Sequence, residues 1–337
     1  MNNGVHTPAP TGNTIPFDPA ERDLGVVVGF DGSEQATRAL HYAARAAQRR
    51  GTKLTVVTAF TLPVGLYANT VGVPDISQED VKRQMAEKTL DSARDYLSGY
   101  PGEVTYRAEH GDASGVLVDL SASAELVVVG ARGRGGFIGR VLGSVATALP
   151  AHAKAPTVVV PRHYPLPEAE GPERFAPAVS DQPVTVGTDG SPDSRIAVLQ
   201  AAQAAQDRQA PLRMIVSLPP LDGALMWYPE LAPRGAEVSE VRQRELSGTL
   251  EAEAEWVSRH FPDLEIIRSV ELGEAITVLT SASREAQLTV VGTRGRGGVA
   301  SALLGSVSRS VLYNAEGPVM VVPHLEDSRL QDAPAAW

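Results

Sequence analysis

The sequence contains no cysteine among its 337 residues. This absence excludes disulfide bonds, thiolate metal sites and a cysteine nucleophile. Long apolar runs are absent too, since none approaches the roughly 18 residues that a membrane span requires. Residues 1–20 also lack the charged-then-apolar order of a signal peptide. We therefore expect a soluble, cytoplasmic protein that does not enter a membrane.

A surplus of positive charge is missing as well, because the formal net charge is −10. Nonspecific nucleic-acid binding depends on Lys and Arg that neutralise phosphates, so we expect no nucleic-acid partner. Acidic residues are nevertheless absent from residues 126–167 and 286–315, which contain Arg132 and Arg294 at matching places. This distribution favours binding of small anions, although arginines on an ordinary solvated surface would give the same pattern.

Glycine is abundant, and part of its pattern occurs twice. Gly130, Gly133 and Gly143 return 162 residues later as Gly292, Gly295 and Gly305. An internal repeat of this length indicates a duplicated domain. We expect a flexible tail at residues 1–20, a first domain at 21–161, a Pro-rich linker at 162–182, a second domain at 183–325 and a C-terminal tail at 326–337.

Strand-like runs alternate with helix-like segments in both halves. The expected strands are residues 25–29, 54–59, 104–108, 125–130 and 157–160, then 184–187, 212–218, 264–269, 288–292 and 319–322. The expected helices include 34–50, 78–97, 114–124, 143–153, 237–260 and 275–286, and one that begins at Pro192. The alternation indicates parallel sheets covered on both faces. We expect the apolar edge strands 157–160 and 319–322 to pair in a pseudo-twofold arrangement.

Each glycine loop leaves a strand and leads into a helix. Backbone N–H groups at a helix start lie at the positive end of the helix dipole and suit a phosphate. Ser144 and Ser306 fall at these helix starts, where each hydroxyl either donates to a phosphate or caps the helix. No Gly-x-x-x-x-Gly-Lys-Ser/Thr motif is present, which excludes a Walker A loop.

These residues closely resemble the universal stress protein family, in particular its ATP-binding branch. The family signature Gly-x2-Gly-x9-Gly-Ser/Thr occurs in both halves, and Asp31 and Asp189 supply the aspartate that follows the first strand. The resemblance implies an α/β fold of two tandem Rossmann-like (adenine nucleotide alpha-hydrolase-like) domains. Each would have a five-stranded parallel sheet between helices, with ATP at the carboxyl ends of the strands.

The resemblance also implies one ATP site in each domain. The residues of the first site would be Gly29, Asp31, Ala59, Gly130, Arg132, Gly133, Gly143, Ser144 and Val145. Those of the second would be Gly187, Asp189, Leu218, Gly292, Arg294, Gly295, Gly305, Ser306, Val307 and Ser308. In this scheme Asp31 and Asp189 bond the ribose or hold Mg²⁺, while Ala59 and Leu218 meet adenine through their backbone. Ala146 stands where the second copy has Ser308, so the first site would lack one hydroxyl donor.

No catalytic constellation is recognisable, because the seven histidines show no short metal-ligand pairing. The favoured function is an ATP-dependent sensor or regulatory switch in stress response, with an unidentified protein partner and a homodimer in addition to the intrachain domain pair. The alternative is a slow ATPase or phosphotransferase with an unrecognised base. A nucleotide-free scaffold is a third reading, which the intact glycine motifs disfavour. Trp227 and Tyr228 could stack on a base, lie in an interface or anchor their loop.

Overall fold

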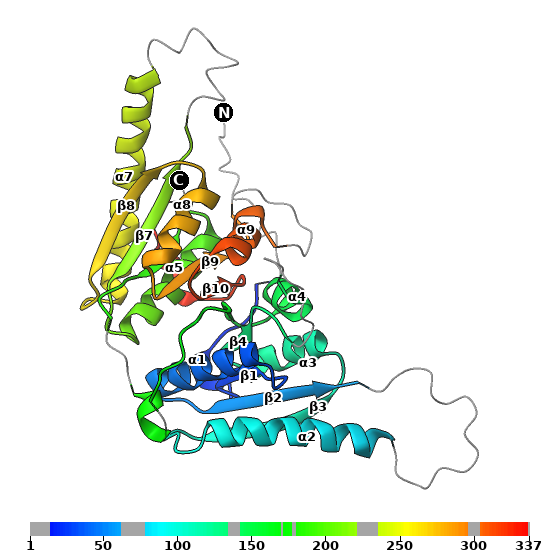
Figure 1. The fold of residues 1–337 in the computed structure, drawn as a ribbon. Helices are drawn as coiled ribbons and strands as arrows, with labels where there is room; N and C mark the ends of the chain where they lie inside the picture. The colour runs from blue at the N-terminus through cyan, green and yellow to red at the C-terminus, as the bar shows by residue number, and fades with distance from the viewer. Residues whose placement is uncertain are drawn as a thin grey trace, which may run out of the picture.

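Ten short strands form one continuous sheet in the computed structural model (Figure 1). The structure describes residues 14–61, 78–133, 142–169, 171–176, 180–220, 235–295 and 304–335. Trp227 and Tyr228 lie outside these ranges, as do the loop segments 134–141 and 296–303. No helix within the described ranges is long and apolar enough to cross a membrane.

The elements follow the same order in both halves of the chain. The first half contains β1 (Val26–Gly29), α1 (Glu34–Arg50), β2 (Leu54–Phe60), α2 (Gln78–Tyr96), β3 (Val104–His110), α3 (Ala113–Leu120), β4 (Leu126–Gly130), α4 (Ser144–His152) and β5 (Thr157–Val160). The second contains β6 (Val184–Gly187), α5 (Pro192–Gln206), β7 (Leu212–Leu218), α7 (Gly235–His260), β8 (Ile266–Leu272), α8 (Ala275–Ala282), β9 (Leu288–Gly292), α9 (Ser306–Asn314) and β10 (Val319–Val322). Short 3-10 helices include Pro19–Glu21, Ser121–Ser123, Gly171–Phe175, Ser283–Glu285 and Ser328–Asp332.

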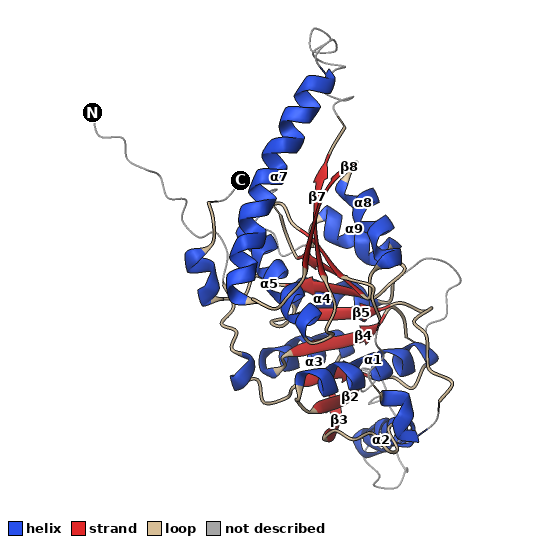
Figure 2. Cartoon of the chain, turned by 90° about the vertical axis from the view of Figure 1, so that its left-hand side faces the viewer, coloured by secondary structure: helices blue, strands red, loops and turns tan. Residues whose placement is uncertain are grey.

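The strand order is β3-β2-β1-β4-β5-β10-β9-β6-β7-β8. Within each domain the five strands are parallel, as predicted. Helices cover both faces, and two apolar layers run through both domains. One layer lies under α1, α2, α5 and α7 and the other under α3, α4, α8 and α9. Figure 2 shows how strongly the sheet twists, with the strands of the first domain running across the view and β7 and β8 running upward.

The two domains meet through an antiparallel pairing of β5 with β10, which confirms the expected edge contact. Val158 lies opposite Met320, its equivalent in the repeat, and Thr157 and Val159 lie opposite Val321 and Val319. This register is symmetric, because equivalent positions of the two strands lie opposite each other at the centre of the pairing, as in a pairing of two identical strands. The domains are therefore related by a pseudo-twofold axis that passes through the middle of the sheet.

Local signals explain where α1 and α5 begin. The Ser33 hydroxyl accepts a hydrogen bond from Ala36 N at 3.1 Å, and the Ser191 hydroxyl does the same for Ser194 N at 3.2 Å. Pro192 occupies the first turn of α5. Alanines fill the buried faces of both helices, which lets these helices pack closely on the sheet.

The largest differences from the expected boundaries occur in three elements. Helices α3 and α8 end at Leu120 and Ala282 and continue as 3-10 turns, short of the expected ends at residues 124 and 286. Strand β8 begins later and ends later than expected, at Ile266 and Leu272. It is an edge strand paired with β7 over its full length, and the charged residues within it obscure its ends in a search for apolar runs.

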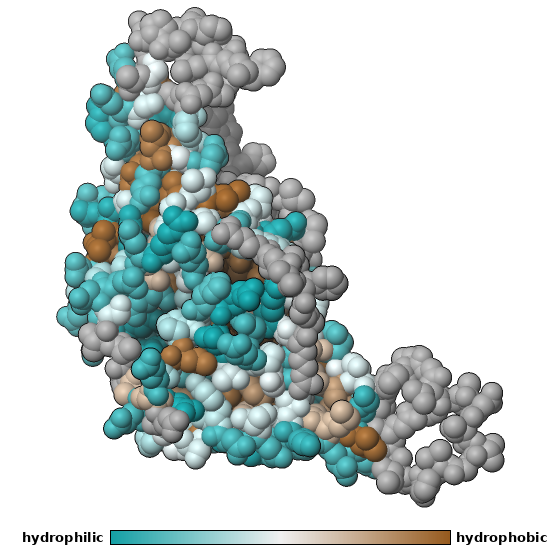
Figure 3. Space-filling view, viewed as in Figure 1, coloured by the Kyte–Doolittle hydropathy of each residue, from teal (hydrophilic) through white to brown (hydrophobic). Residues whose placement is uncertain are grey.

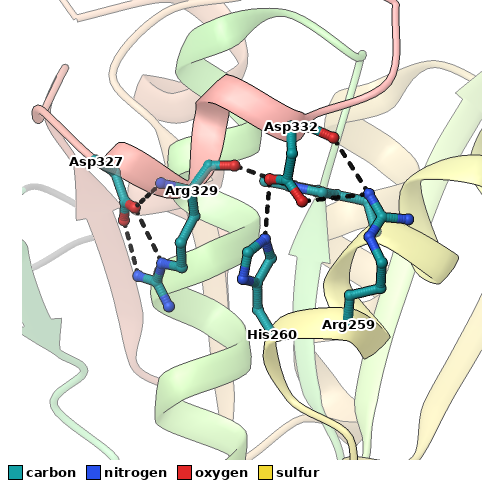
Figure 4. Close-up of polar contacts among 6 residues, drawn as sticks. Arg259, His260, Asp327, Arg329 and Asp332 are labelled. Atoms are coloured by element: carbon teal, nitrogen blue, oxygen red, sulfur yellow. Dashed lines mark hydrogen bonds and ion pairs between the residues drawn. The ribbon is translucent and has the colours of Figure 1, made fainter.

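The chain ends that were expected to be flexible tails make specific bonds in residues 14–20 and 326–335. Ile15 pairs with Leu325 in an isolated parallel bridge. The segment of residues 325–335, called the C-terminal strap here, lies against the C-terminal end of α7, where Figure 4 shows Asp332 bonded to Arg259 and His260. There Asp332 Oδ1 accepts a hydrogen bond from Trp256 Nε1 at 3.1 Å and lies 3.1 Å from His260 Nε2.

The Pro-rich linker also packs on the first domain. Phe175 is 1% exposed, and its ring contacts those of Tyr96, Tyr100 and His41. Arg174 lies over the Tyr96 ring and donates to Tyr96 O at 3.1 Å. The linker and the C-terminal strap thus cover corresponding outer faces, because each follows the last strand of its domain.

Candidate functional site

A cavity of about 620 Å³ lies at the carboxyl ends of β1, β2 and β4 in the first domain. This volume falls within the range of small-molecule sites. All the residues predicted for the first site line it: Gly29, Asp31, Ala59, Gly130, Arg132, Gly133, Gly143, Ser144 and Val145. The parallel strands bring these distant positions together, as the rule for ligand sites in open α/β sheets anticipates.

An aspartate lies against the glycine loop in each domain. Asp31 Oδ1 accepts a hydrogen bond from Ser33 N at 3.0 Å, and a Cβ on Gly133 would lie 2.5 Å from Asp31 Oδ2. In the second domain Asp189 Oδ1 accepts from Ser191 N at 3.1 Å, and a Cβ on Gly295 would lie 2.5 Å from Asp189 Oδ2. A side chain at either glycine would have to displace the carboxylate, so the observed contact of carboxylate and loop depends on glycine in both copies.

Backbone hydrogen bonds hold both ends of each glycine loop. Ala131 N donates to Val160 O at 2.8 Å, and Gly143 N donates to Ala131 O at 2.8 Å. The second domain repeats both bonds through Thr293, at 2.9 and 2.8 Å. Each loop therefore starts and ends at fixed points between β4 and α4 in the first domain and between β9 and α9 in the second.

Helices α4 and α9 begin at these fixed points with a glycine at the N-cap. Gly143 and Gly305 occupy the N-cap positions, and within the described ranges no side-chain cap bonds the first-turn N–H groups. Ser144 and Ser306 are the first helical residues and are exposed. Capping by these serines, one of the two roles left open by the sequence, is thus excluded. First-turn N–H groups have no intrahelical partner and carry the positive end of the dipole, which suits an anion.

Ser308 has a structural task. It is 5% exposed, and its hydroxyl donates to Gly292 O at 2.6 Å. The hydroxyl proton is therefore used inside the loop in this structure, and the expected donor role of Ser308 toward a ligand stays a prediction. Ala146 in the first domain is buried at the corresponding place.

Gly29 and Gly187 are glycines for a reason of packing. A Cβ on Gly29 would lie 2.8 Å from Leu117 Cδ1, and one on Gly187 would lie 2.7 Å from Leu279 Cδ1. The leucines of α3 and α8 thus close the site from the second face of the sheet. Each contact joins a strand to a helix that is distant in the sequence, so the sequence alone does not reveal it.

One predicted equivalence is shifted by a residue. Ala59 pairs with Glu109, and the matching pair in the second domain is Ser217 with Glu271. Leu218 corresponds to Phe60. Side chains alternate along a strand, so Ser217 is the residue on the same face as Ala59. The counterpart of Ala59 in the second domain is therefore Ser217 and not Leu218.

Apolar lining residues escaped the sequence analysis. They are Phe30, Ala36, Val57, Ala113, Leu117, Val129 and Leu142. The alternation along β2 could have indicated Val57, which lies two residues before Ala59 on the same face. Ala113 and Leu117 come from α3, and only the tertiary fold brings them to the cavity.

A histidine was also missed beside the second site. His324 Nδ1 bonds Asp193 Oδ1, and the Asp193 carbonyl oxygen lies 3.2 Å from the position that a Cβ on Gly292 would take. The hydrogen bond to Asp193 raises the pKa of His324, against the opposing effects of burial and Arg294. The first domain has Arg162 and Gln35 at the equivalent positions, so the two sites differ in charge.

The described residues offer little support for a metal ion that protein side chains alone would hold. The described residues contain no group of three or more His, Cys, Asp or Glu side chains that could hold one. Asp31 and Asp189 each supply one carboxylate. A Mg²⁺ ion keeps several waters and typically binds through one or two carboxylates together with substrate phosphates, so any Mg²⁺ here would arrive with a nucleotide.

Comparison with known proteins gives matches over both domains. The universal stress protein family matches residues 25–161 and 182–323. Universal stress protein Rv1996 of Mycobacterium tuberculosis is 33% identical over 322 residues, which cover 89% of this chain and 95% of that protein. Universal stress protein Rv2623 of the same organism is 33% identical over 302 residues, which cover 88% and 96%.

Among solved structures, a universal stress protein from Archaeoglobus fulgidus DSM 4304 has the same architecture. Its TM-score is 0.57 at 18% sequence identity, and the match covers 90% of this chain and 99% of that one. At this identity the likeness concerns the fold alone, and it extends over both domains.

Proposed function

The chain belongs to the universal stress protein family, and from this premise we propose that it is an ATP-binding regulatory switch of the stress response with one nucleotide site in each domain. One repeated observation carries the proposal. In both domains a carboxylate lies against a glycine loop that leads into a helix with a glycine at the N-cap. Because the arrangement is preserved in both domains, it supports an anion site in each domain better than one functional site and one copy that no longer binds.

Each part of the first site has a task in this proposal. The first-turn N–H groups of α4 would hold phosphate oxygens, and Ser144 would donate its exposed hydroxyl to them. Asp31 would accept hydrogen bonds from ribose hydroxyls. Val57 and Leu117 give the inner wall its apolar character, which suits the faces of a purine.

The lining also supports binding more than turnover. Among the described residues that line the first cavity, Asp31 is the one carboxylate, and it is already bonded to Ser33 N. General base catalysis needs a group placed to take a proton from water. The site is therefore suited to holding ATP, with hydrolysis slow enough for the bound state to act as a signal.

Separate silencing of the two loops tests the proposal. A Cβ on Gly143 would lie 3.4 Å from Arg132 Cα, an ordinary contact, so Gly143→Val should fold and place its methyl groups at the cavity wall. Gly305→Val makes the equivalent change in the second domain, where the Cβ would lie 3.2 Å from Thr293 O and the backbone must shift slightly to admit it. Calorimetric titration with ATP should give about two equivalents for the parent, about one for each single variant and none for the double variant.

Gly248→Val is the matched control, because a Cβ at this position in α7 meets nothing within 4 Å. It should bind ATP like the parent. A parent that binds one equivalent, unchanged by Gly143→Val, would show that the first loop is structural. Sustained phosphate release at or above about 1 s⁻¹ would favour the ATPase alternative.

A further inference from the structure

A second cavity, of about 420 Å³, lies where the two domains meet. It is bounded by the second half of α1, the start of the linker, Arg208 after α5 and the residues before β10. Its lining shares no residue with that of the first nucleotide cavity. On the face drawn in Figure 3, hydrophilic side chains gather between the two domains. We name this cavity the junction pocket.

Three arginines converge on the junction pocket. Arg45 and Arg49 come from α1, and Arg208 comes from the other domain. Arg208 donates to Tyr42 Oη at 2.7 Å and to Ala204 O at 2.8 Å. The Nε atoms of Arg45 and Arg49 are buried and lack a hydrogen-bond partner within the described part of the chain. None of the three arginines has a carboxylate within 4.0 Å in that part.

The shared lining of the junction pocket gives these cations a mutual electrostatic effect. Burial, followed by the charge of Arg208, lowers the pKa of Arg49 to about 10. A guanidinium rarely loses this much of its proton affinity, because it is normally solvated or paired. The rim adds one further arginine, Arg284, but Glu316 pairs with it at 2.9 Å. The three inner arginines are thus left without a counter-charge from the described residues.

The opposite side of the pseudo-twofold axis shows how such a cluster is balanced without a ligand. The repeat places Gln203, Asp207 and Arg50 where the junction pocket has Arg45, Arg49 and Arg208. There Asp207 lies 3.6 Å from Arg50 and accepts a hydrogen bond from Gln203 at 2.8 Å. An acid therefore neutralises the arginine on one side, whereas an additional arginine takes its place on the other.

A purely structural role explains only part of the cluster. An arginine in the last turn of a helix is stabilised by the helix dipole, and its aliphatic stem can cover aromatic rings. Arg49 lies in the last turn of α1, but Arg45 lies one turn earlier, where the dipole has little effect. Neither role compensates three cations that repel each other across a domain boundary.

We infer that the junction pocket binds the phosphate group of a small phosphorylated molecule, independently of the nucleotide loops. Guanidinium groups hold phosphate oxygens through paired, charge-assisted hydrogen bonds, and three of them around one group match a dianion better than a single carboxylate. The volume leaves room for a small organic group beside the phosphate. Because both domains supply arginines, an occupant would bridge them.

Titration calorimetry of the full chain at constant ionic strength tests this inference. The probes are inorganic phosphate and glucose 6-phosphate, which separate a free anion from a phosphate ester. Whichever probe the parent binds, Arg49→Gln and Arg208→Gln should each weaken its affinity roughly tenfold or more, because each substitution removes a charged hydrogen-bond donor. Arg83→Gln is the matched control, since it removes an equal charge from an exposed, paired arginine on α2.

Urea unfolding in phosphate-free buffer shows whether the variants fold. Arg49→Gln should be at least as stable as the parent, because it relieves repulsion among partly buried cations. Binding of either probe that is lost in both pocket variants and kept in Arg83→Gln supports the inference. Equal binding by the parent and by folded Arg49→Gln would overturn it, and so would failure of the parent to bind either probe at millimolar concentration. Neither negative result would affect the two nucleotide loops, which have their own variants.

Discussion

At the scale of single residues, His41 shows how burial sets a protonation state. It is 0% exposed in α1, its Nδ1 lies 3.1 Å from Tyr96 Oη, and its ring stacks on Phe175. Burial, followed by the charges of Arg45, Arg174 and Arg49, lowers the pKa of His41 to about 4. The native protein therefore holds a neutral imidazole at neutral and mildly acidic pH.

This state predicts an acid sensitivity that one substitution removes. Between about pH 6.5 and pH 4 the unfolded chain protonates this histidine and the folded chain does not, so the free energy of unfolding falls as the pH falls. The full loss is about 3 kcal/mol. His41→Phe keeps an aromatic ring against Phe175, and its stability should decline less across this pH range. Urea midpoints at pH 7, 6, 5 and 4.5 measure the difference.

His110→Gln serves as the control for this titration, because His110 is exposed. It should follow the pH curve of the parent. Parallel curves for the parent and His41→Phe would show that His41 titrates normally in the folded protein.

At the scale of elements, α1 and α5 end with the same backbone conformation, although different residues adopt it. Thr52 N donates to Ala47 O at 3.0 Å, and Ala210 N donates to Ala205 O at 3.0 Å. This ending requires a residue with positive φ, and the two positions are Gly51 at φ 65° and Gln209 at φ 52°. Gln209 therefore adopts a conformation that side chains with a Cβ disfavour.

Gln209→Gly should stabilise the protein by about 0.5–1 kcal/mol, because the relieved strain exceeds the added freedom of the unfolded chain. Urea unfolding of the folded variant measures the change. Gln206→Gly, three residues earlier at the end of α5, should instead destabilise by a similar amount, since its backbone is helical. A loss of stability in both variants would contradict the assignment of strain to Gln209.

Local signals determined which elements the sequence could predict. Ser33 and Gly51 mark both ends of α1, and its expected bounds are confirmed. Helix α3 ends early because the buried Ser121 hydroxyl donates to Val118 O at 2.5 Å and accepts from Lys154 N at 2.8 Å. The second of these bonds joins positions 33 residues apart. No pattern in the local sequence contains that information.

The candidate sites divide along the same line. The glycine loops are short motifs in which each residue type has a local reason, so Gly130, Gly133, Gly143 and Ser144 could be predicted. Gln35, Leu117 and the arginines of the junction pocket contact their neighbours across elements or domains. Residues that contact each other across elements or domains could not be predicted from the sequence, because only the fold brings them together.

At the scale of the whole molecule, the β5–β10 pairing joins the two domains into one core. Met320 and Val158 are buried opposite each other, and the apolar layer that contains them extends into both domains. Cutting this contact should affect residues on both sides of the axis. The domains are therefore expected to unfold together.

Met320→Ala tests this coupling. It removes buried atoms at the centre of the pairing and should lower the free energy of unfolding by about 2–4 kcal/mol. Hydrogen exchange followed by mass spectrometry should show faster exchange in β1 and β4 as well as in β6 and β9. Met85→Ala, at a 58% exposed position on α2, should leave all four strands unchanged. Faster exchange confined to the second domain would show that the domains unfold independently.

The symmetric strand pairing also has a consequence for counting ligands. In a dimer of two identical chains, every feature beside the axis must occur on both sides, so a cluster of like charges on one side would be doubled. Here a single chain supplies both halves, and each side of the axis can carry different residues. A molecule bound in the junction pocket would be counted once per chain, whereas molecules bound at the glycine loops would be counted twice. Stoichiometry alone can therefore distinguish the two kinds of site.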